Sequence, residues 1–466
     1  MGDIKREGSD DLTGGEVTSA PPNMVGTGEA VDSQNLDPRD LRGATTRDGR
    51  GQQGVNNGSD VAVDGLRFWK RDNGTDFLIA RLATTFYDVS AAAWASIGIG
   101  GTSGEIFRAA PLNDILAIVV DGLAPQKFSG STLSALGGSP PSESKYAVAH
   151  MSKLWLAGDD ANPQKKSFSA SNNPENFTAA NDAGSITTQD GGGDTIQGLA
   201  TNRKALLTFY RSYTDVLTGD SIANYREERL TDRGLVSKTG YASAGEVVFF
   251  ASDDAIYMVA GTRVSDLSTL KFRQTYKDIS DKSKVSLGVK GDLLLVVDYG
   301  ADKAYACAYK YNRWATWTGG IWKTMDTGND QTLYAGVDGG STTQVWKLDT
   351  GSLDGTATVA AYWRIPNLGF GWPDAPKSLH RIKLHAKPGL GTTTITYYKN
   401  GVSTGSTTDV TFAATGDHDW VARKGQSAIR GHYLGFKFAW NGPGTLYGWA
   451  AYAQILSEGG QVPAED

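Results

Sequence analysis

The residues that could bind a metal or transfer a proton are few and widely spread. The five histidines are His150, His380, His385, His418 and His432, and no His-Glu-x-x-His pair of the zinc-peptidase type occurs. His380 and His385 are five residues apart, so on a strand they point to opposite faces and do not share a metal ion. The histidines therefore predict no zinc site.

Acidic residues gather in short polar segments at Asp159-Asp160, Asp182, Asp190–Asp194 and Asp298–Asp302. A calcium loop needs oxygen ligands at close, alternating spacing, whereas three glycines separate Asp190 from Asp194. A solvated loop is the favoured interpretation, and a calcium site is the alternative. Glycoside hydrolysis needs two carboxylates at a defined separation in space, which the sequence leaves open.

Other catalytic motifs are missing. Gly98–Gly104 (GIGGTSG) has Ser103 where a dinucleotide fingerprint has glycine, and no helical pattern follows it. Neither a Walker A sequence nor a Gly-x-Ser-x-Gly sequence occurs. The single cysteine, Cys307, lies in a strand-like run (AYACAYKY), where we expect a buried, inert thiol. We predict no catalytic residue, no cofactor and no metal, so the chain is not expected to be an enzyme.

Tryptophan is abundant, with 12 residues in the chain. Trp314, Trp317 and Trp322 lie close together, and Trp363 and Trp372 flank an Arg-Ile-Pro segment. Exposed aromatic side chains can bind sugars or stack on bases. In a β-rich chain, packing in the core and between sheets is the favoured interpretation, and anchoring at a protein interface is the second.

A recurring unit positions these residues: an apolar run, a polar turn, and a second apolar run that ends near glycine. Its copies are Tyr146–Gly158, Ile196–Gly219, Tyr241–Gly261, Val285–Trp314 and Thr332–Gly351, with weaker copies at Phe68–Val89 and Ile106–Phe128. The spacing is about 40 residues, which is typical of the blades of a β-propeller. Runs such as Val247–Ala251 are apolar throughout, as in strands that are buried on both faces. We predict an all-β propeller of six or seven blades.

Composition agrees with this fold class. The chain has 466 residues, 39% of them hydrophobic, and 58 glycines, a balance that many short strands and turns produce. The net charge is −6, with 45 basic and 51 acidic residues and no basic block, which argues against a protein that grips nucleic acid by its phosphates. The charged opening MGDIKREGSDD is not a signal peptide, and no apolar run is long enough to cross a membrane.

The sequence divides into three parts. Residues 1–54 form a polar arm, residues 55–352 hold the repeats, and residues 353–466 predict a β-sandwich-like domain. A hairpin is expected in this last part, from Tyr433–Trp440 through Asn441–Gly444 into Thr445–Leu456. The arm is too poor in apolar residues to order by itself. We expect an extended arm that lies on a neighbouring subunit, and the alternative support is its own chain.

Charged and amide side chains of the arm, and of the mixed-charge segment Arg226–Arg233 (REERLTDR), are the candidate subunit contacts. These candidates are Asn35, Asp37, Arg39, Arg42, Arg47, Arg229 and Arg233. In Arg226–Arg233 the acidic residues would oppose a phosphate, so a salt-bridged loop or a subunit contact is the favoured interpretation.

Several segments, taken in order, carry a resemblance to a known family. The arm reads AVDSQNLDPRDLRG at Ala30–Gly43 and then TRDG at Thr46–Gly49, and later segments read NNPENF at Asn172–Phe177 and DRGLVS at Asp232–Ser237. This succession resembles the tail hub or nozzle proteins of tailed bacteriophages, and it is similar in segment order to the packaged-DNA stabilisation proteins of short-tailed phages. The glycine- and acid-rich stretch Ala179–Asp194 departs from that family.

The resemblance implies a propeller-bearing structural protein of the virion tail that is made in the host bacterial cytoplasm. It implies a ring, usually of six copies, below the portal and adaptor proteins, with tail fibre or plug proteins as further partners. The ring would extend the DNA channel and retain the packaged genome, and DNA would pass without sequence-specific binding. The residues leave two alternatives open: a carbohydrate- or receptor-binding propeller, and a propeller hydrolase.

Overall fold

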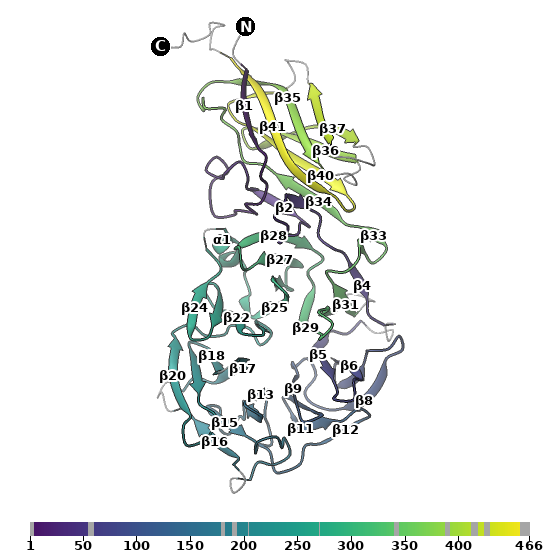
Figure 1. Ribbon diagram of the computed structural model, residues 1–466, viewed down its shortest axis with the longest axis vertical. Helices are drawn as coiled ribbons and strands as arrows, with labels where there is room; N and C mark the ends of the chain where they lie inside the picture. Colours follow the sequence, from purple (N-terminus) through teal and green to yellow (C-terminus); the bar gives the residue numbers. More distant parts are fainter. Residues whose placement is uncertain are drawn as a thin grey trace.

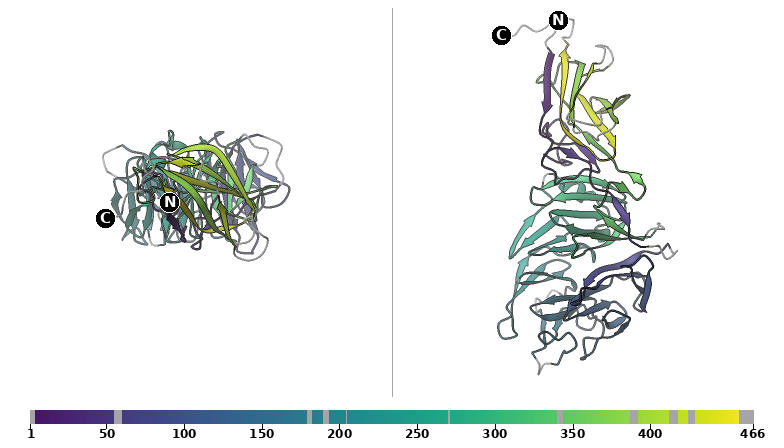
Figure 2. Two further views of the ribbon diagram at one scale, coloured as in Figure 1. Left: turned by 90° about the horizontal axis from the view of Figure 1, so that it is seen from above. Right: turned by 45° about the vertical axis from the view of Figure 1, so that its right-hand side comes forward.

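The computed structural model is almost entirely β-structure. It describes residues 4–54, 60–178, 182–188, 193–203, 205–269, 271–339, 344–386, 392–411, 418–423 and 429–456, with only the backbone of 418–423. The described strands form a β-propeller and a β-sandwich, stacked end to end in an elongated molecule (Figure 1, Figure 2). The predicted all-β propeller with a sandwich-like domain is confirmed.

The described residues form seven propeller blades, each a four-stranded antiparallel sheet at its core. Blade 1 consists of β5 (Val63–Lys70), β6 (Asp76–Leu82), β7 (Thr85–Asp88) and β8 (Ala95–Ile99), and blade 2 of β9 (Arg108–Leu112), β10 (Ile115–Val120), β11 (Leu123–Phe128) and β12 (Leu133–Ala135). Blade 3 consists of β13 (Tyr146–His150), β14 (Lys153–Ala157), β15 (Lys165–Phe168) and β16 (Gly184–Thr187), and blade 4 of β17 (Ile196–Asn202), β18 (Ala205–Tyr210), β19 (Thr214–Thr218) and β20 (Arg226–Thr231).

Blade 5 consists of β21 (Tyr241–Ala244), β22 (Val247–Ala251), β23 (Ile256–Ala260) and β24 (Arg263–Asp266). Blade 6 consists of β25 (Val285–Lys290), β26 (Leu293–Asp298), β27 (Lys303–Ala308) and β28 (Arg313–Thr318). Blade 7 consists of β29 (Trp322–Thr327), β30 (Leu333–Val337), β31 (Val345–Leu348) and β4 (Arg50–Gln52). Two short strands, β32 (Leu353–Asp354) and β33 (Ala357–Thr358), extend blade 7. Helix α1 (Arg273–Lys277) and a 3-10 turn (Lys282–Lys284) connect blades 5 and 6.

The apolar runs form the second strand of each blade, where both faces are covered. In β26 all six residues are buried, and in β10 five of six are. Adjacent blades pack face to face around such strands, so a continuous apolar sequence is required in place of the usual alternation. Between β9 and β10, Asn113 and Asp114 adopt φ angles of 52° and 57°. That pair of left-handed residues is the turn that a two-residue hairpin needs.

The ring of blades is closed by the N-terminal arm. Strand β4 comes before blade 1 in sequence but pairs with β31 as the outer strand of blade 7, with Arg50 opposite Leu348 and Gln52 opposite Trp346. Blade 7 is therefore built from both ends of the propeller sequence. The pairing attaches the segment just before blade 1 to blade 7, and the ion pairs Arg67–Asp326 and Lys323–Asp64 also join these two blades.

The sandwich also takes strands from the arm. One sheet holds β1 (Ile4–Ser9), β41 (Thr445–Ile455), β35 (Lys377–Ala386) and β38 (His418–Arg423), with β3 (Ala44–Thr45) and β39 (Arg430–Gly431) at its margins. The other sheet is β2 (Asp32–Gln34), β34 (Ala360–Arg364), β40 (Leu434–Asn441), β36 (Thr392–Lys399) and β37 (Val402–Thr411). The predicted hairpin corresponds to β40 and β41, which lie in different sheets and do not pair with each other.

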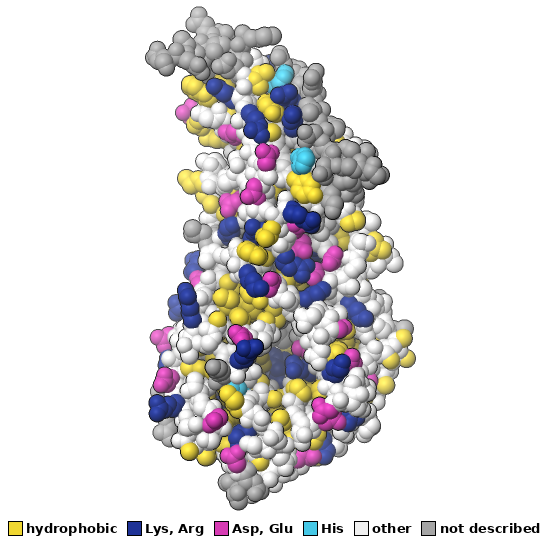
Figure 3. All heavy atoms as spheres, viewed as in Figure 1, with side chains coloured by type: hydrophobic (Ala, Val, Ile, Leu, Met, Phe, Trp, Pro, Cys, Tyr) yellow, Lys and Arg dark blue, Asp and Glu magenta, His cyan; other side chains and the backbone are white. Residues whose placement is uncertain are grey.

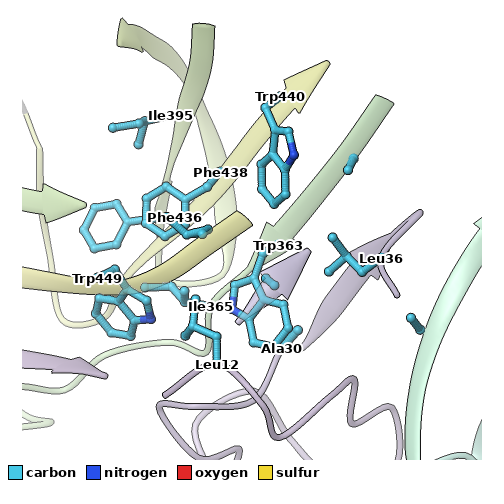
Figure 4. Close-up of a cluster of buried hydrophobic side chains, with 14 of the residues drawn as sticks. Leu12, Ala30, Leu36, Trp363, Ile365, Ile395, Phe436, Phe438, Trp440 and Trp449 are labelled. Carbon is cyan, nitrogen blue, oxygen red and sulfur yellow. The ribbon is translucent and has the colours of Figure 1, made fainter. Parts of the chain in front are cut away.

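One continuous apolar core joins the two bodies. It runs from Trp317 of blade 6 through Leu36 and Ala30 of the arm to Trp363 and Trp440 of the sandwich, and Figure 4 shows the part of it around the arm and the sandwich. The sandwich stands on the rim of the propeller beside blades 6 and 7 (Figure 1). The arm lies in this junction, so its support is its own chain.

Removing residues 1–52 is expected to abolish stable folding. The deletion takes the outer strand from blade 7 and uncovers the core at Trp317 and Trp363. Size-exclusion chromatography and thermal unfolding followed by circular dichroism should show aggregation and no cooperative transition. Removing residues 1–10 takes only β1 and should leave a cooperative transition. A soluble, cooperatively unfolding 53–466 fragment would contradict the closing role of β4.

Candidate functional site

The innermost strands of the blades surround a central cavity of about 440 Å³. Small side chains line much of it, which is why space remains along the propeller axis: Ala109, Ala110, Ala147, Ala149, Ala200, Ala242 and Gly288. Figure 3 shows the face of the propeller hollowed at its centre, with Lys or Arg side chains inside the hollow. The cavity is the first candidate site.

A polar bridge crosses the propeller axis between blades 2 and 5. Arg108, at the start of β9, donates from Nε to the Tyr241 hydroxyl at 2.9 Å and from Nη2 to the Lys238 carbonyl. The Lys238 ammonium in turn lies 2.5 Å from a carboxylate oxygen of Glu105. We call these four residues the axial bridge. It ties blades that are not neighbours in the ring and closes part of the cavity.

The cavity holds one carboxylate among its described lining residues, Asp326. Its Oδ1 accepts from Nη1 of Arg67 at 3.2 Å, and its Oδ2 accepts from the backbone N–H of Phe68 at 2.6 Å. Burial raises the pKa of Asp326, and the Arg67 guanidinium opposes this rise. A pair of carboxylates of the kind that glycosidases use therefore does not line the described cavity, and neither histidine nor cysteine lines it.

The second candidate site is the junction of arm, blade 6 and sandwich, centred on Arg47. The Arg47 side chain is 1% exposed and makes a two-point ion pair with Asp354, at 3.0 and 2.6 Å. Its Nε donates to Asn35 Oδ1 at 3.0 Å, and its guanidinium lies 5.0 Å from the centroid of the Trp317 ring. Such a planar, buried, two-point pair suits arginine and would not suit lysine.

Asn35 connects Arg47 to both bodies. Its side-chain amide donates to the Ala360 carbonyl at 2.7 Å and to Thr318 Oγ1 at 3.0 Å, and its Oδ1 accepts from the Thr318 backbone N–H at 2.9 Å. Its φ of 54° is in the left-handed region, which asparagine tolerates better than most residues. Asn35 therefore provides a left-handed backbone conformation, a side-chain donor and a side-chain acceptor at the same position. We call Asn35, Arg47, Trp317 and Asp354 the arm joint.

Arg39 and Asp37 make a further ion-pair network beside the arm joint. Arg39 pairs with Asp37 at 2.9 Å and with Asp349 of the connection after blade 7 at 2.8 Å, and Lys290 of blade 6 lies 3.0 Å from the same Asp349. The network links the arm to blades 6 and 7. Its carboxylates are paired with cations, which offsets the cost of removing them from water.

The remaining candidate contacts lie on the surface. Arg42 pairs with Asp40 at 3.1 Å, and its side chain is 68% exposed. Arg229 pairs with Asp215, and Arg233 with Asp254. Arg229 belongs to β20, the outer strand of blade 4, and Arg233 to the connection between blades 4 and 5. Strand β20 lies away from the arm (Figure 1). The structure thus brings Asn35, Asp37, Arg39 and Arg47 together and leaves the other three apart.

Those four residues were predicted as contacts between subunits, and here their partners lie in the same chain. Arg47 and Asn35 are buried, so they have no surface left for a neighbour; for them the expected subunit contact is replaced by a contact between domains. The sequence analysis did not identify Asp349 and Asp354, because isolated acidic residues in polar segments carry no periodicity that marks them as buried.

The other residues singled out in the sequence are structural where they are described. Cys307 is buried, and burial raises the pKa of its thiol. Burial lowers the pKa of His150 to about 4. Among the described tryptophans only Trp372 is exposed, at 47%, and most of the others are buried in the core, which confirms the packing interpretation. Asp190 and the side chain of His418 lie outside the described residues.

Among the described residues, no group of three or more His, Cys, Asp or Glu side chains converges as metal ligands would. No helix in the described part of the chain is long and apolar enough to cross a membrane.

Comparison with known proteins gives only distant likenesses. No protein-family model matches the chain, and no curated protein sequence is similar to it. Among solved structures, the extracellular domain of the putative one component system BT4673 from B. thetaiotaomicron is similar at a TM-score of 0.46 and 9% identity, covering 74% of this chain and 45% of that one.

The Neurospora crassa Pan2 WD40 domain is similar at a TM-score of 0.44 and 10% identity, covering 65% of this chain and 95% of that one. The AfRom2 CNH domain is similar at 0.42 and 9%, covering 64% and 99%. The assignment of the propeller rests on its own sheet order and not on these weak likenesses.

Replacing Arg47 by methionine is expected to lower the free energy of unfolding by roughly 3 kcal/mol, because Asn35 loses a donor and Asp354 keeps only its longer ion pair with Arg50, at 3.9 Å. Methionine keeps much of the contact with Trp317, so the loss reports on the charge. Arg42→Met, in the same arm but exposed, should leave the urea midpoint unchanged. Equal effects of the two substitutions in urea unfolding would contradict the role of the arm joint.

Proposed function

We propose that this chain is a structural subunit of a bacteriophage tail, a hub or nozzle protein that forms a ring around the DNA path. The observation that carries the proposal is where the family-like residues lie. Asn35, Asp37, Arg39 and Arg47, which belong to the segments that resemble the family, hold the arm between propeller and sandwich. These contacts support the proposal because they fix the arm between two domains, and a subunit of a tail ring must keep its shape.

The two later family-like segments also lie at joints, in this case between blades. In Asn172–Phe177, Glu175 pairs with Lys127 of blade 2 at 2.7 Å and accepts from the Gly137 backbone N–H at 3.0 Å. In Asp232–Ser237, the Ser237 hydroxyl donates to the Ser283 carbonyl ahead of blade 6 at 2.9 Å. Glycine is needed at Gly234, where a Cβ would lie 2.2 Å from the Arg211 carbonyl oxygen.

In this proposal, DNA passes along the axis of the ring and not through a single propeller. The axial bridge crosses the propeller centre, and the cavity of about 440 Å³ is too small for a duplex whose major groove alone accepts a whole helix. With a net charge of −6 and no basic block, the ring would not hold the phosphates tightly, so DNA would slide. The chain would need no cofactor and would catalyse no reaction.

The proposed partners are further copies of the chain, with six in the ring, the adaptor or portal-side proteins above it and fibre or plug proteins below it. The proposed location is the virion tail. A ring of identical subunits uses two different complementary surfaces on each copy. The exposed rim residues Arg229 and Arg233 remain candidates for one of those surfaces, because their side chains are 41% and 48% exposed.

The decisive experiment is to locate the chain in phage particles made from the genome that encodes it. We expect immunogold labelling of a tagged chain to mark the tail below the portal, and particles without the chain to lose their DNA. Native mass spectrometry of the purified chain, or of tails, should show a closed ring. Absence of the label from purified particles would overturn the proposal, and binding to a glycan array would favour the receptor-binding alternative.

A further inference from the structure

A single carboxylate, Glu16, connects the propeller to the sandwich. Its Oε2 accepts from the Ser33 hydroxyl of β2 at 2.8 Å, and from both the backbone N–H and the hydroxyl of Thr316 in β28 at 3.1 Å. Strand β2 belongs to a sheet of the sandwich, and β28 is the outer strand of blade 6. Glu16 is 6% exposed, so this contact lies inside the molecule.

Backbone hydrogen bonds surround the carboxylate on the same three segments. The Glu16 N–H donates to the Trp314 carbonyl at 2.9 Å, and the Val17 N–H to the Ala30 carbonyl at 2.9 Å. The Asn35 N–H donates to the Thr316 carbonyl at 2.7 Å. A change in the volume or hydration of the Glu16 carboxyl therefore acts directly on the bonds that attach the arm to blade 6.

The charges around Glu16 do not balance it. Within the described part of the chain, no lysine, arginine or histidine makes a salt bridge with its carboxylate. The titratable groups that face it are Asp32 of β2, Tyr362 of β34 and Tyr305 of β27, and the Tyr362 hydroxyl donates to Asp32 at 2.9 Å. Burial, and then the nearby Asp32, raise the pKa of Glu16 to about 7, although the hydroxyls and N–H of Ser33 and Thr316 oppose the rise.

We propose that Glu16 is a proton-dependent lock between propeller and sandwich, closed when its carboxyl is protonated and loosened when it is ionised. Ionisation places an uncompensated charge in the junction, and the least costly response is to admit water between the arm and blade 6. The lock lies in the junction itself, so it operates whatever the chain binds, and it does not depend on the proposed tail function.

The direction of the pH effect follows from the two protonation states. The folded chain holds the Glu16 proton more tightly than the unfolded chain does, so this stabilisation is complete below about pH 4.5 and is lost as the pH rises through about 7. Acid therefore strengthens the junction, which is the reverse of what a carboxylate paired with arginine would give.

Hydrogen exchange of the full chain, measured by mass spectrometry from pH 5.5 to 8.5, tests the lock. Peptides that carry the Val17 and Asn35 amides should lose protection by about tenfold or more across neutral pH, relative to peptides from β22 in blade 5, which correct for the intrinsic pH dependence. In Glu16→Gln, an isostere of the protonated acid, this ratio should stay constant. An unchanged ratio in the unmodified chain, or an equal loss in Glu16→Gln, would overturn the proposal.

Two further variants keep the test decisive if Glu16→Gln folds poorly. Ser33→Ala removes a hydroxyl that donates to the Glu16 carboxylate. The ionised form loses a hydrogen bond, so the pKa of Glu16 should rise further and the midpoint of the protection change should move to higher pH. The stability of the junction should also fall at every pH. Glu29→Gln is the matched control, because Glu29 lies in the same arm but pairs with Lys271 at 3.1 Å near the surface. It should leave the pH response of the Val17 and Asn35 amides intact, and abolition of that response by Glu29→Gln would also contradict the lock.

Discussion

The structure depends on the return of the first fifty residues to both bodies of the molecule. A ring of sheets has no covalent closure, and a strand that pairs across the gap adds backbone hydrogen bonds to the side-chain contacts between its first and last blades. Here β4 provides that strand by pairing with β31. Because β1, β2 and β3 of the same arm enter the sandwich, one polar segment closes the propeller and attaches the second domain. Backbone hydrogen bonds carry this arrangement, which explains how an arm with so few apolar residues is ordered.

Ordering the arm costs backbone entropy at each residue, and the contacts around Arg47 show how that cost is offset. Arg47 combines a buried two-point ion pair, a bond to Asn35 and the face of Trp317. The Trp317 indole N–H also donates to the Leu36 carbonyl at 2.7 Å. Each of these groups satisfies another that would otherwise be buried without a partner, so the arm joint behaves as a unit and substitutions within it should not be additive.

The propeller could be predicted from the sequence because apolar runs repeat along it. Runs such as Val247–Ala251 recur at blade spacing, and each corresponds to the second strand of a blade. The closure of the ring by β4 could not be predicted from the sequence. Strand β4 is only three residues long, Arg50–Gln52, and has no apolar side chain. Its pairing is made by backbone groups, which leave no periodic pattern of side chains. The arm's charged residues were visible as candidates, but their partners were not: an ion pair such as Arg39–Asp349 joins residues that are distant in sequence.

The same limit applied to the interior of the propeller. The axial bridge joins Arg108 and Glu105 of blade 2 to Tyr241 and Lys238 of blade 5, and only the closed ring brings these blades face to face across an axis. Repeats report what every blade shares, whereas a bridge between two particular blades departs from the repeat. Features that distinguish this propeller from others are therefore made by residues that depart from the repeat. In the sequence alone these residues look like ordinary polar positions.

The junction buries charge in two different ways, and the contrast defines its behaviour. Arg47 is buried beside a carboxylate of opposite charge, Asp354. Glu16 is buried with donors that carry no charge, the Ser33 and Thr316 hydroxyls and the Thr316 N–H. Hydrogen bonds from neutral groups lower the cost of a buried carboxylate without removing it. The proposed lock therefore acts where Glu16 attaches the arm to β28, and the Arg47–Asp354 ion pair is a separate attachment of the same arm.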